Sequence, residues 1–165
     1  MTIIKYPFLP EGRKIEYVTA SDVYMKLARA FAEAQSLDAV MPGAAVIVYK
    51  GRVIGIGANG SDYHKTHACQ RVAIKCKSGE GYELCEGCHP KNHSEAKAIN
   101  VAVAQGHRID LWGADLYLWG HWWCCEPCWI AMLQAGINNV YLLESSEILF
   151  NKEHADNIVG KQFQS

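Results

Sequence analysis

The chain has 165 residues, of which 50% are hydrophobic and 20% are charged, so it can bury the core of one compact domain and is not disordered. Its 16 basic and 17 acidic side chains give a net charge of −1, which argues against a protein held on nucleic acid or on an anionic membrane by bulk charge. No apolar run is long enough to cross a bilayer, and the N-terminus lacks the apolar core of a signal peptide. We therefore expect a cytoplasmic protein with a single domain over residues 1–165.

The first predicted elements are a helix and a hairpin. Apolar residues recur every three or four positions after Ser21, which predicts a helix over about 21–36. Two β-branched runs in AAVIVYKGRVIGIG flank Lys50-Gly51-Arg52 and predict a hairpin of buried strands. The segment from about 58 to 92 shows little periodicity, and a loop of this length in a small domain is usually functional or braced.

Helices and strands alternate in the second half of the chain. Asn92 is the expected N-cap of a second helix, and Glu95 follows it at the spacing of a capping box. This alternation favours a layered α/β domain with a parallel portion in its sheet. The later predicted elements are a strand over 114–120, a third helix from near Cys125 to Gly136, a strand over 138–144, and a short helix or strand after Ser145.

Two short motifs carry residues that can do chemistry. His93 and Glu95 lie at the start of the second predicted helix, and Cys125 and Cys128 lie at the start of the third. Thiolates are favoured at helix N-termini, and one imidazole with two thiolates leaves the open fourth position of a catalytic zinc. Glu95 could face that position without binding the metal and could move the protons of an activated water.

Each motif also has a simpler interpretation. Glu95 could only close a capping box with Asn92. Cys125-x-x-Cys128 could be a thiol redox pair or half of a structural zinc site. Both motifs in this order, separated by one strand, are however the signature of zinc deaminases that act on nucleobases.

The sequence resembles the cytidine and deoxycytidylate deaminase superfamily from about residue 44 to 143, through "GIGANG", "NHSEAKAI" and "CEPCW". The resemblance implies a three-layer α/β/α sandwich around a mixed sheet, with a zinc-binding core over about 93–143. It also implies that His93, Cys125 and Cys128 bind zinc and that Glu95 is the proton shuttle. By the same resemblance Asn59 contacts a sugar, and the backbone amide of Ala96 faces the base.

The long segment before His93 resembles deoxycytidylate deaminases more than the shorter base or nucleoside deaminases. The expected reaction is hydrolysis of deoxycytidylate to deoxyuridylate and ammonia, and Arg71 is a candidate for contact with the phosphate. The alternatives are deamination of guanine, a pterin or a riboflavin precursor, or a non-catalytic zinc module. Two departures from the family pattern bear on the substrate: Cys124 stands where proline is usual, and Ser61-Asp62-Tyr63-His64 replaces a glycine-containing stretch.

Four cysteines of the long loop form a second constellation. Cys85-x-x-Cys88 has the spacing of zinc ligands, and it resembles the second, structural zinc site of some deoxycytidylate deaminases. The alternative is a set of buried, reduced thiols. We also expect a homo-oligomer, since five tryptophans are many for so short a chain. The candidate ligands of the second zinc are Cys69, Cys76, Cys85, Cys88 and His89.

Overall fold

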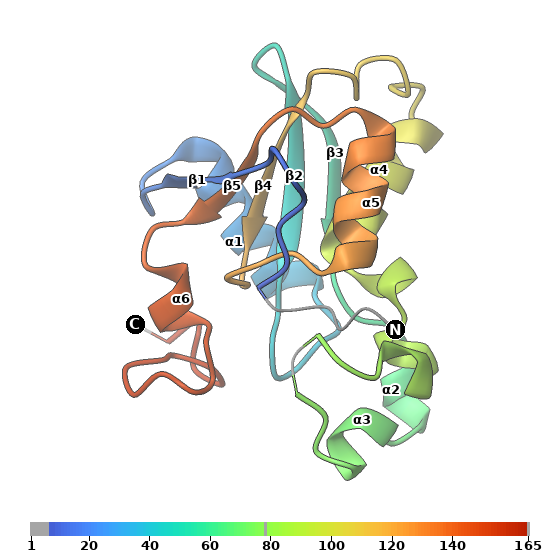
Figure 1. Ribbon diagram of the computed structural model, residues 1–165, viewed down its shortest axis with the longest axis vertical. Helices are drawn as coiled ribbons and strands as arrows, with labels where there is room; N and C mark the ends of the chain where they lie inside the picture. Colours follow the sequence, from blue (N-terminus) through green and yellow to red (C-terminus); the bar gives the residue numbers. More distant parts are fainter. Residues whose placement is uncertain (1–6, 78, 165) are drawn as a thin grey trace.

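The computed structural model describes residues 7–77 and 79–164, so both ends of the expected 1–165 domain lie outside the described residues. A five-stranded sheet forms its centre, in the order β1-β5-β4-β2-β3 (Figure 1). Strand β5 pairs in parallel with β1 and β4, whereas β2 pairs antiparallel with β4 and β3, so the sheet is mixed. The strands are β1 (Ile15–Val18), β2 (Ala44–Tyr49), β3 (Arg52–Ala58), β4 (Asp115–Trp119) and β5 (Val140–Leu143).

The predicted hairpin is confirmed as β2 and β3. Tyr49 pairs with Arg52, so Lys50 and Gly51 form a two-residue turn. Both turn residues have positive φ, 50° and 75°, as the turn type that matches the twist of a hairpin requires. The register shifts between Ile47 and Val48, which marks a bulge in this pair of strands.

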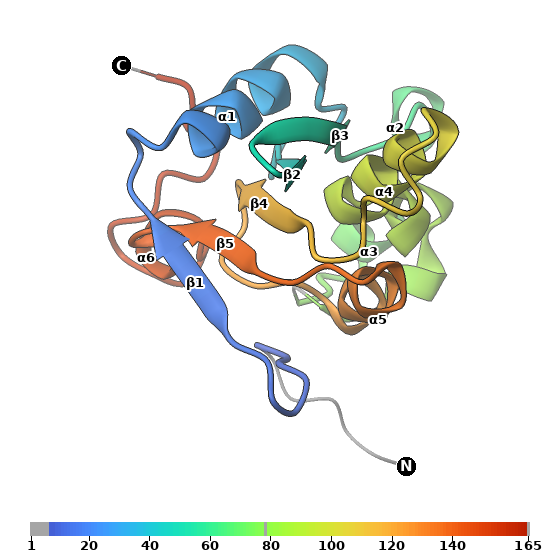
Figure 2. The ribbon, with the colours of Figure 1, turned by 90° about the horizontal axis from the view of Figure 1, so that it is seen from above.

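Helices cover both faces of the sheet, which confirms the expected three-layer α/β/α sandwich. Figure 2 shows α1 on one side and α4 and α5 on the other. Alternate residues of one strand face the two layers: Leu116 and Leu118 of β4 pack with α4 and α5, whereas Tyr117 and Trp119 pack with α1 and the C-terminal segment. The longer helices are α1 (Val23–Gln35), α4 (Ser94–Ala104) and α5 (Glu126–Ala135), and a short helix α6 (Ser146–Leu149) follows β5.

Two glycines allow α4 to lie directly on β3. A Cβ at Gly55 would lie 2.4 Å from the backbone oxygen of Ala98, and one at Gly57 would lie 2.5 Å from the backbone nitrogen of the same residue. No side chain fits in this space. The two glycines of the GIGANG motif thus allow the sheet to pack closely against the helix that carries His93 and Glu95.

The structure corrects three of the sequence-based predictions. Helix α1 begins at Val23 and not at Ser21, and its N-cap is Asp22, whose Oδ1 accepts bonds of 2.9 Å from the amides of Tyr24 and Met25. The N-cap of α4 is His93 and not Asn92. Strand β1 was not predicted, because its pairing partner β5 is more than a hundred residues away.

The long segment 58–92 is made of single turns. It contains helices α2 (Tyr63–Thr66) and α3 (Gln70–Ala73), followed by 3₁₀ turns over Tyr82–Leu84, Glu86–Cys88 and Pro90–Asn92. Among the helices of the described residues, none has the length and the apolar character needed to cross a membrane.

Candidate active site

The N-termini of α4 and α5 bring His93, Cys125 and Cys128 together. His93 is the N-cap of α4 and Cys125 is the N-cap of α5. Each sulfur lies 3.4 Å from Nδ1 of His93, and the three ligand atoms are all within 4.8 Å of one another. A nitrogen and a sulfur bound to one tetrahedral zinc at about 2.0 and 2.3 Å would be roughly 3.6 Å apart. The donor set and its spacing therefore fit zinc.

The electrostatics of this cluster favour one thiolate beside one thiol. The hydrogen bond from Cys128 lowers the pKa of Cys125 to about 6, with a further contribution from His93 and against the effect of burial. The hydrogen bond to Cys125, together with burial, raises the pKa of Cys128 well above its usual value. Burial by itself lowers the pKa of His93, but the hydrogen bond with Cys125 and the charges of Cys125 and Glu95 outweigh it and raise that pKa. A cation would stabilise both sulfurs as thiolates.

Glu95 is next to this cluster and is only 5% exposed. The capping box that could have explained it is absent, because the N-cap of α4 is His93 and no side chain accepts a capping hydrogen bond there. The side-chain amide of Asn92 donates to the carbonyls of Glu86 and Gly87, at 3.1 and 3.2 Å. Cys124, which replaces the usual proline, has its pKa raised well above normal by burial and by the neighbouring Glu95 carboxylate. Glu95 therefore has a neutral thiol at its side.

A cavity of about 530 Å³ opens in front of the cluster, and His93, Glu95 and Cys125 are part of its wall. Trp122 and Trp123 also line it, as does His121, whose pKa is lowered to about 4, mainly by burial. His121 is thus neutral near pH 7. Its imidazole can donate or accept one hydrogen bond in the cavity.

The Asn59 side chain lines the same cavity but is already used by the fold. Its Oδ1 accepts from Ser36 Oγ at 2.5 Å and from the Gly43 amide at 2.9 Å, and its Nδ2 donates to the Met41 carbonyl at 2.8 Å. Nδ2 also lies 3.4 Å from Nε2 of His121. The predicted sugar contact would have to share these groups with the backbone.

Two residues on the first turn of α4 differ in their relation to the cavity. Ser94 is part of the wall, and its buried hydroxyl has no hydrogen-bond partner among the described residues. Ala96 lies one residue beyond Glu95 and is half-buried, and it is not part of the described wall. Its backbone N–H is one of the first four of the helix, which have no intrahelical partner. The sequence motif predicted an amide contact at Ala96 but gave no reason to select Ser94.

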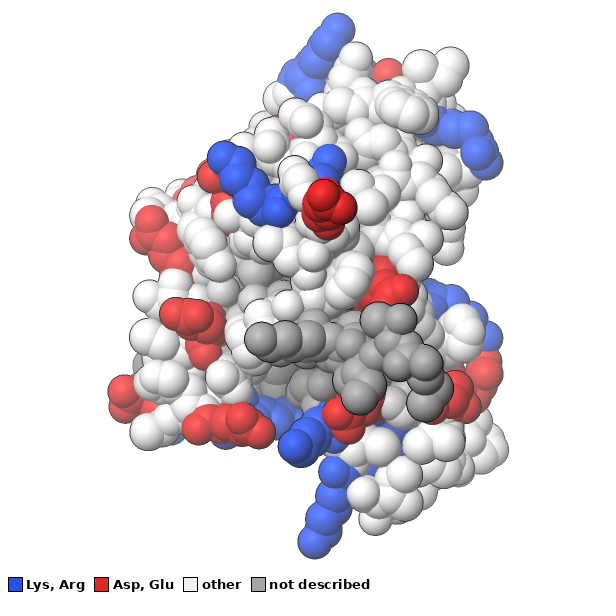
Figure 3. All heavy atoms as spheres, viewed as in Figure 1, with Lys and Arg blue, Asp and Glu red and all other residues white. Residues whose placement is uncertain are grey.

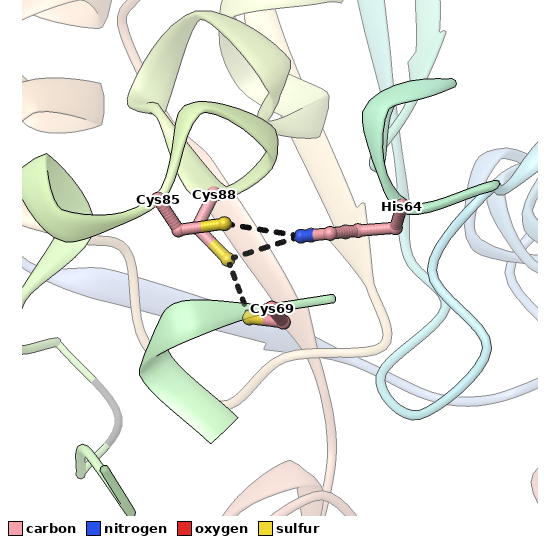
Figure 4. A group of neighbouring side chains, drawn as sticks. All are labelled: His64, Cys69, Cys85 and Cys88. Atoms are coloured by element: carbon pink, nitrogen blue, oxygen red, sulfur yellow. Dashed lines mark hydrogen bonds between the residues drawn. The ribbon is translucent and has the colours of Figure 1, made fainter. Parts of the chain in front are cut away.

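The predicted second cluster forms with a different membership. Cys69, Cys85 and Cys88 meet as expected, but the imidazole among them is that of His64, on α2 (Figure 4). Nδ1 of His89, a candidate ligand, instead accepts from the amide of Lys91 at 3.0 Å.

Cys76 is likewise outside the group whose ligand atoms converge. It lies against Gly81, where a Cβ would be 2.8 Å from its sulfur. The convergent group thus leaves out Cys76 and His89 of the candidate ligands and includes His64. The sequence analysis did not name His64, although the spacing His64-x4-Cys69 was a usable signal.

The thiols of this second cluster also differ in acidity. Burial opposes ionisation of Cys85, but hydrogen bonds from His64 and from backbone amides lower its pKa to about 6. Burial raises the pKa of Cys88 to about 12, and the neighbouring Cys69 adds to this effect. These opposite shifts favour a thiolate at Cys85 beside a neutral thiol at Cys88.

Arg71 lies between the two clusters. Its Nε donates to the Glu80 carbonyl at 2.8 Å and its Nη2 to the Lys77 carbonyl at 3.1 Å. Its guanidinium carbon is 4.5 Å from the centroid of the Tyr82 ring. Two of the donors predicted to meet a substrate phosphate thus contact backbone carbonyls of the protein itself.

A model of the family described as "Cytidine and deoxycytidylate deaminase zinc-binding region" matches residues 19–144, which is most of the chain. The chain belongs to this family, and it is accordingly a zinc-dependent hydrolytic deaminase. None of the curated proteins compared with it matches.

Similar solved structures include enzymes with different named substrates. The apo dCMP deaminase of cyanophage S-TIM5 is 22% identical, with a TM-score of 0.47 over 74% of this chain and 82% of the other. The guanine deaminase of Bacillus subtilis is 20% identical, with a TM-score of 0.47 over 76% and 66%.

A further similar solved structure is that of the diaminohydroxyphosphoribosylaminopyrimidine deaminase/5-amino-6-(5-phosphoribosylamino)uracil reductase of Thermotoga maritima. It is 21% identical, with a TM-score of 0.45 over 73% of this chain. The chain spans only 28% of the length of that protein.

Proposed function

We propose that this deaminase acts on a free pyrimidine nucleotide and converts deoxycytidylate to deoxyuridylate and ammonia. The observation that carries the proposal is the position of the buried Glu95 next to the group of His93, Cys125 and Cys128, beside a cavity of about 530 Å³ that Glu95, His93 and Cys125 line. A redox role for the two cysteines would not need an imidazole at 3.4 Å from both sulfurs.

In the proposed mechanism, His93, Cys125 and Cys128 would hold zinc beside the cavity. Zinc in such a site supplies Lewis acidity and lowers the pKa of a bound water from about 15.7 towards about 7. Glu95 would take a proton from a water in the cavity as the water oxygen bonds to the carbon that carries the amino group, and it would deliver this proton to the ring nitrogen. It would then pass the second proton of the former water to the amino group, so that the C–N bond breaks and ammonia leaves. The Ser94 hydroxyl, which lines the cavity and has no hydrogen-bond partner among the described residues, is available to the base.

The charges of the protein support a small anionic substrate. Lys152 lines the cavity, and within the described residues its ammonium makes no ion pair. On the face shown in Figure 3, basic and acidic side chains are interspersed over the described surface, without an extended basic area of the kind that nucleic acid requires. Seven unpaired cysteines are consistent with the reducing cytoplasm, where we place the protein.

The first prediction tests Glu95. Glu95→Gln removes the base but keeps the shape of the side chain, so we expect a folded protein that binds zinc and loses deamination by about 10⁴-fold. The measurement is ammonia release, with zinc content and thermal unfolding as controls. Activity within a few-fold of the parent would show that Glu95 does not move the protons.

The substrate is tested by screening ammonia release across nucleobases, nucleosides and nucleotides, with guanine, pterins and riboflavin precursors included. We expect deoxycytidylate to have the highest kcat/KM. A higher value for a purine or a pterin would replace the pyrimidine assignment and leave the role of Glu95 intact. Inactivity of the zinc-loaded parent on every compound would instead favour the non-catalytic module.

A further inference from the structure

We infer that His64, Cys69, Cys85 and Cys88 form a second metal site that binds zinc and holds one wall of the active-site cavity in place. Figure 4 shows the three sulfurs and the imidazole nitrogen pointing toward a common centre. His64, Cys69 and the pair Cys85/Cys88 come from three different turns of the segment 58–92, so their convergence is a property of the tertiary structure.

The distances agree with a single tetrahedral ion. Nε2 of His64 lies 3.2 Å from the sulfur of Cys85 and 4.0 Å from that of Cys88, and the sulfurs of Cys69 and Cys88 are 3.6 Å apart. Around one tetrahedral zinc, two sulfurs would be roughly 3.8 Å apart, and a sulfur and a nitrogen roughly 3.6 Å apart. All four ligand atoms lie within 4.8 Å of one another.

The chemistry and the number of the ligands indicate which ion binds here and whether its role is structural or catalytic. Three thiolates and one imidazole are soft ligands that suit zinc and not magnesium or calcium. Four protein ligands also complete a tetrahedral shell, which is typical of structural zinc, whereas a catalytic site keeps one position open. This site therefore differs in kind from the three-ligand cluster at His93.

Gly87 gives independent support for the ligand role of His64. A Cβ at this position would lie 2.6 Å from Cε1 and Nε2 of the imidazole, so the ring packs directly on the backbone between Cys85 and Cys88. Any other residue at 87 would push the imidazole away from the sulfurs. The segment Cys85-Glu86-Gly87-Cys88 thus has both the ligand spacing and the gap that admits the fourth ligand.

The segment has little apolar packing of its own. The two short helices and the 3₁₀ turns at Tyr82–Leu84 and Pro90–Asn92 contain no buried residue. A loop of this length is usually functional or braced, and the free energy of metal binding can stabilise such a segment. One ion at this site would link α2, the N-terminus of α3 and the 3₁₀ turn Glu86–Cys88.

The site is also connected to the active site. His64, Cys69 and Cys88 line the cavity that contains Glu95. The Tyr82 ring meets the His93 ring edge-on, with centroids 4.8 Å apart, and Arg71 packs on the same tyrosine. Loss of the second ion should therefore loosen the wall that faces the substrate.

The test is the zinc content of the full chain after expression with excess zinc and removal of loosely bound metal. We expect two equivalents in the parent, one in Cys85→Ser/Cys88→Ser and one in Cys128→Ala. Cys76→Ser and His89→Ala are matched controls from the same loop, and both should keep two. One equivalent in the parent, or two in the Cys85/Cys88 double variant, would overturn the site.

A measurement on the parent protein covers the case in which the double variant does not fold. Substitution by cadmium should give two ¹¹³Cd resonances, one from a site with three sulfurs and one from a site with two. A single resonance would overturn the proposal, as would a disulfide between Cys69 and Cys88 in the protein purified with zinc and without oxidant. Failure of the catalytic assignment would leave the three-sulfur resonance in place, so the two proposals are separable.

Discussion

At the scale of single residues, Asn59 shows how one side chain serves both the fold and the cavity. It is 7% exposed and joins the ends of α1 and β3 to the segment before β2 through its bonds to Ser36, Met41 and Gly43. Removal of these bonds leaves a buried backbone N–H and C=O without partners. An unsatisfied buried group typically costs about 1–3 kcal/mol.

We therefore predict that Asn59→Ala lowers the free energy of unfolding by at least about 2 kcal/mol, whatever the substrate. Urea unfolding of the zinc-loaded protein measures this loss. Asn100→Ala, at an exposed position of α4, is the control and should be close to neutral. An Asn59→Ala protein as stable as the parent would mean that this asparagine is kept for the substrate alone.

Arg71 and Lys152 offer a second test at this scale. Arg71 is held by the carbonyls of Lys77 and Glu80, whereas the Lys152 ammonium is free of ion pairs among the described residues. We predict that Lys152→Ala weakens binding of deoxyuridylate about ten-fold and leaves binding of deoxyuridine unchanged, because only the phosphate is affected.

Arg71→Gln should instead weaken both ligands by the same factor, since it loosens the wall that both of them contact. Calorimetric titration of the two products gives the comparison. A loss confined to deoxyuridylate in Arg71→Gln would restore the phosphate role that the sequence suggested for this residue.

At the scale of elements, the contact between α4 and β3 sets the position of the catalytic turn. His93 begins α4, and the helix packs on β3 where Gly55 and Gly57 leave room for its backbone. The distance between this helix and α5 decides whether one imidazole can reach two sulfurs. Packing at the two glycines therefore has a direct consequence for the site.

We predict that Gly57→Ala destabilises the protein by about 1–3 kcal/mol, because its Cβ would meet Ala98 N at 2.5 Å and the Lys97 Cβ at 2.7 Å. It should also lower the affinity for zinc. Arg52→Ala on the same strand is exposed and should change the stability by less than about 0.5 kcal/mol. Equal unfolding midpoints for the two variants would contradict this account of the helix–sheet contact.

At the scale of the whole molecule, exposed apolar side chains bear on assembly. Trp112 is 70% exposed and Ile109, in the same connection between α4 and β4, is 83% exposed. Large apolar side chains that cluster on a surface often mark a contact with another chain. We predict that the protein self-associates.

Sedimentation at micromolar concentration measures the assembly directly. We expect a species heavier than the 18.4 kDa of one chain, and Trp112→Ser should shift the distribution toward the monomer. Sedimentation of the parent as 18.4 kDa alone, over the whole concentration range, would rule out the oligomer.

The sequence alone determined the features that depend on neighbouring residues. Helical periodicity after Ser21, the β-branched runs around Lys50-Gly51, and the pairs His93/Glu95 and Cys125/Cys128 are all encoded within a few positions. Local sterics and hydrogen bonds act over this range, so the corresponding helices and the hairpin could be predicted. His93 is 32 and 35 positions away from Cys125 and Cys128, so the first cluster was predicted from the two motifs together and from the family resemblance.

Only the tertiary structure decided which distant residues meet. It placed β1 beside β5, directed His64 and not His89 toward the three thiols, and turned the Asn92 amide away from the helix that it was expected to cap. These outcomes depend on contacts between segments that lie apart in the chain, and several side chains compete for each of them. Local patterns supply the candidates for such contacts, and the free energy of packing the whole chain selects among them.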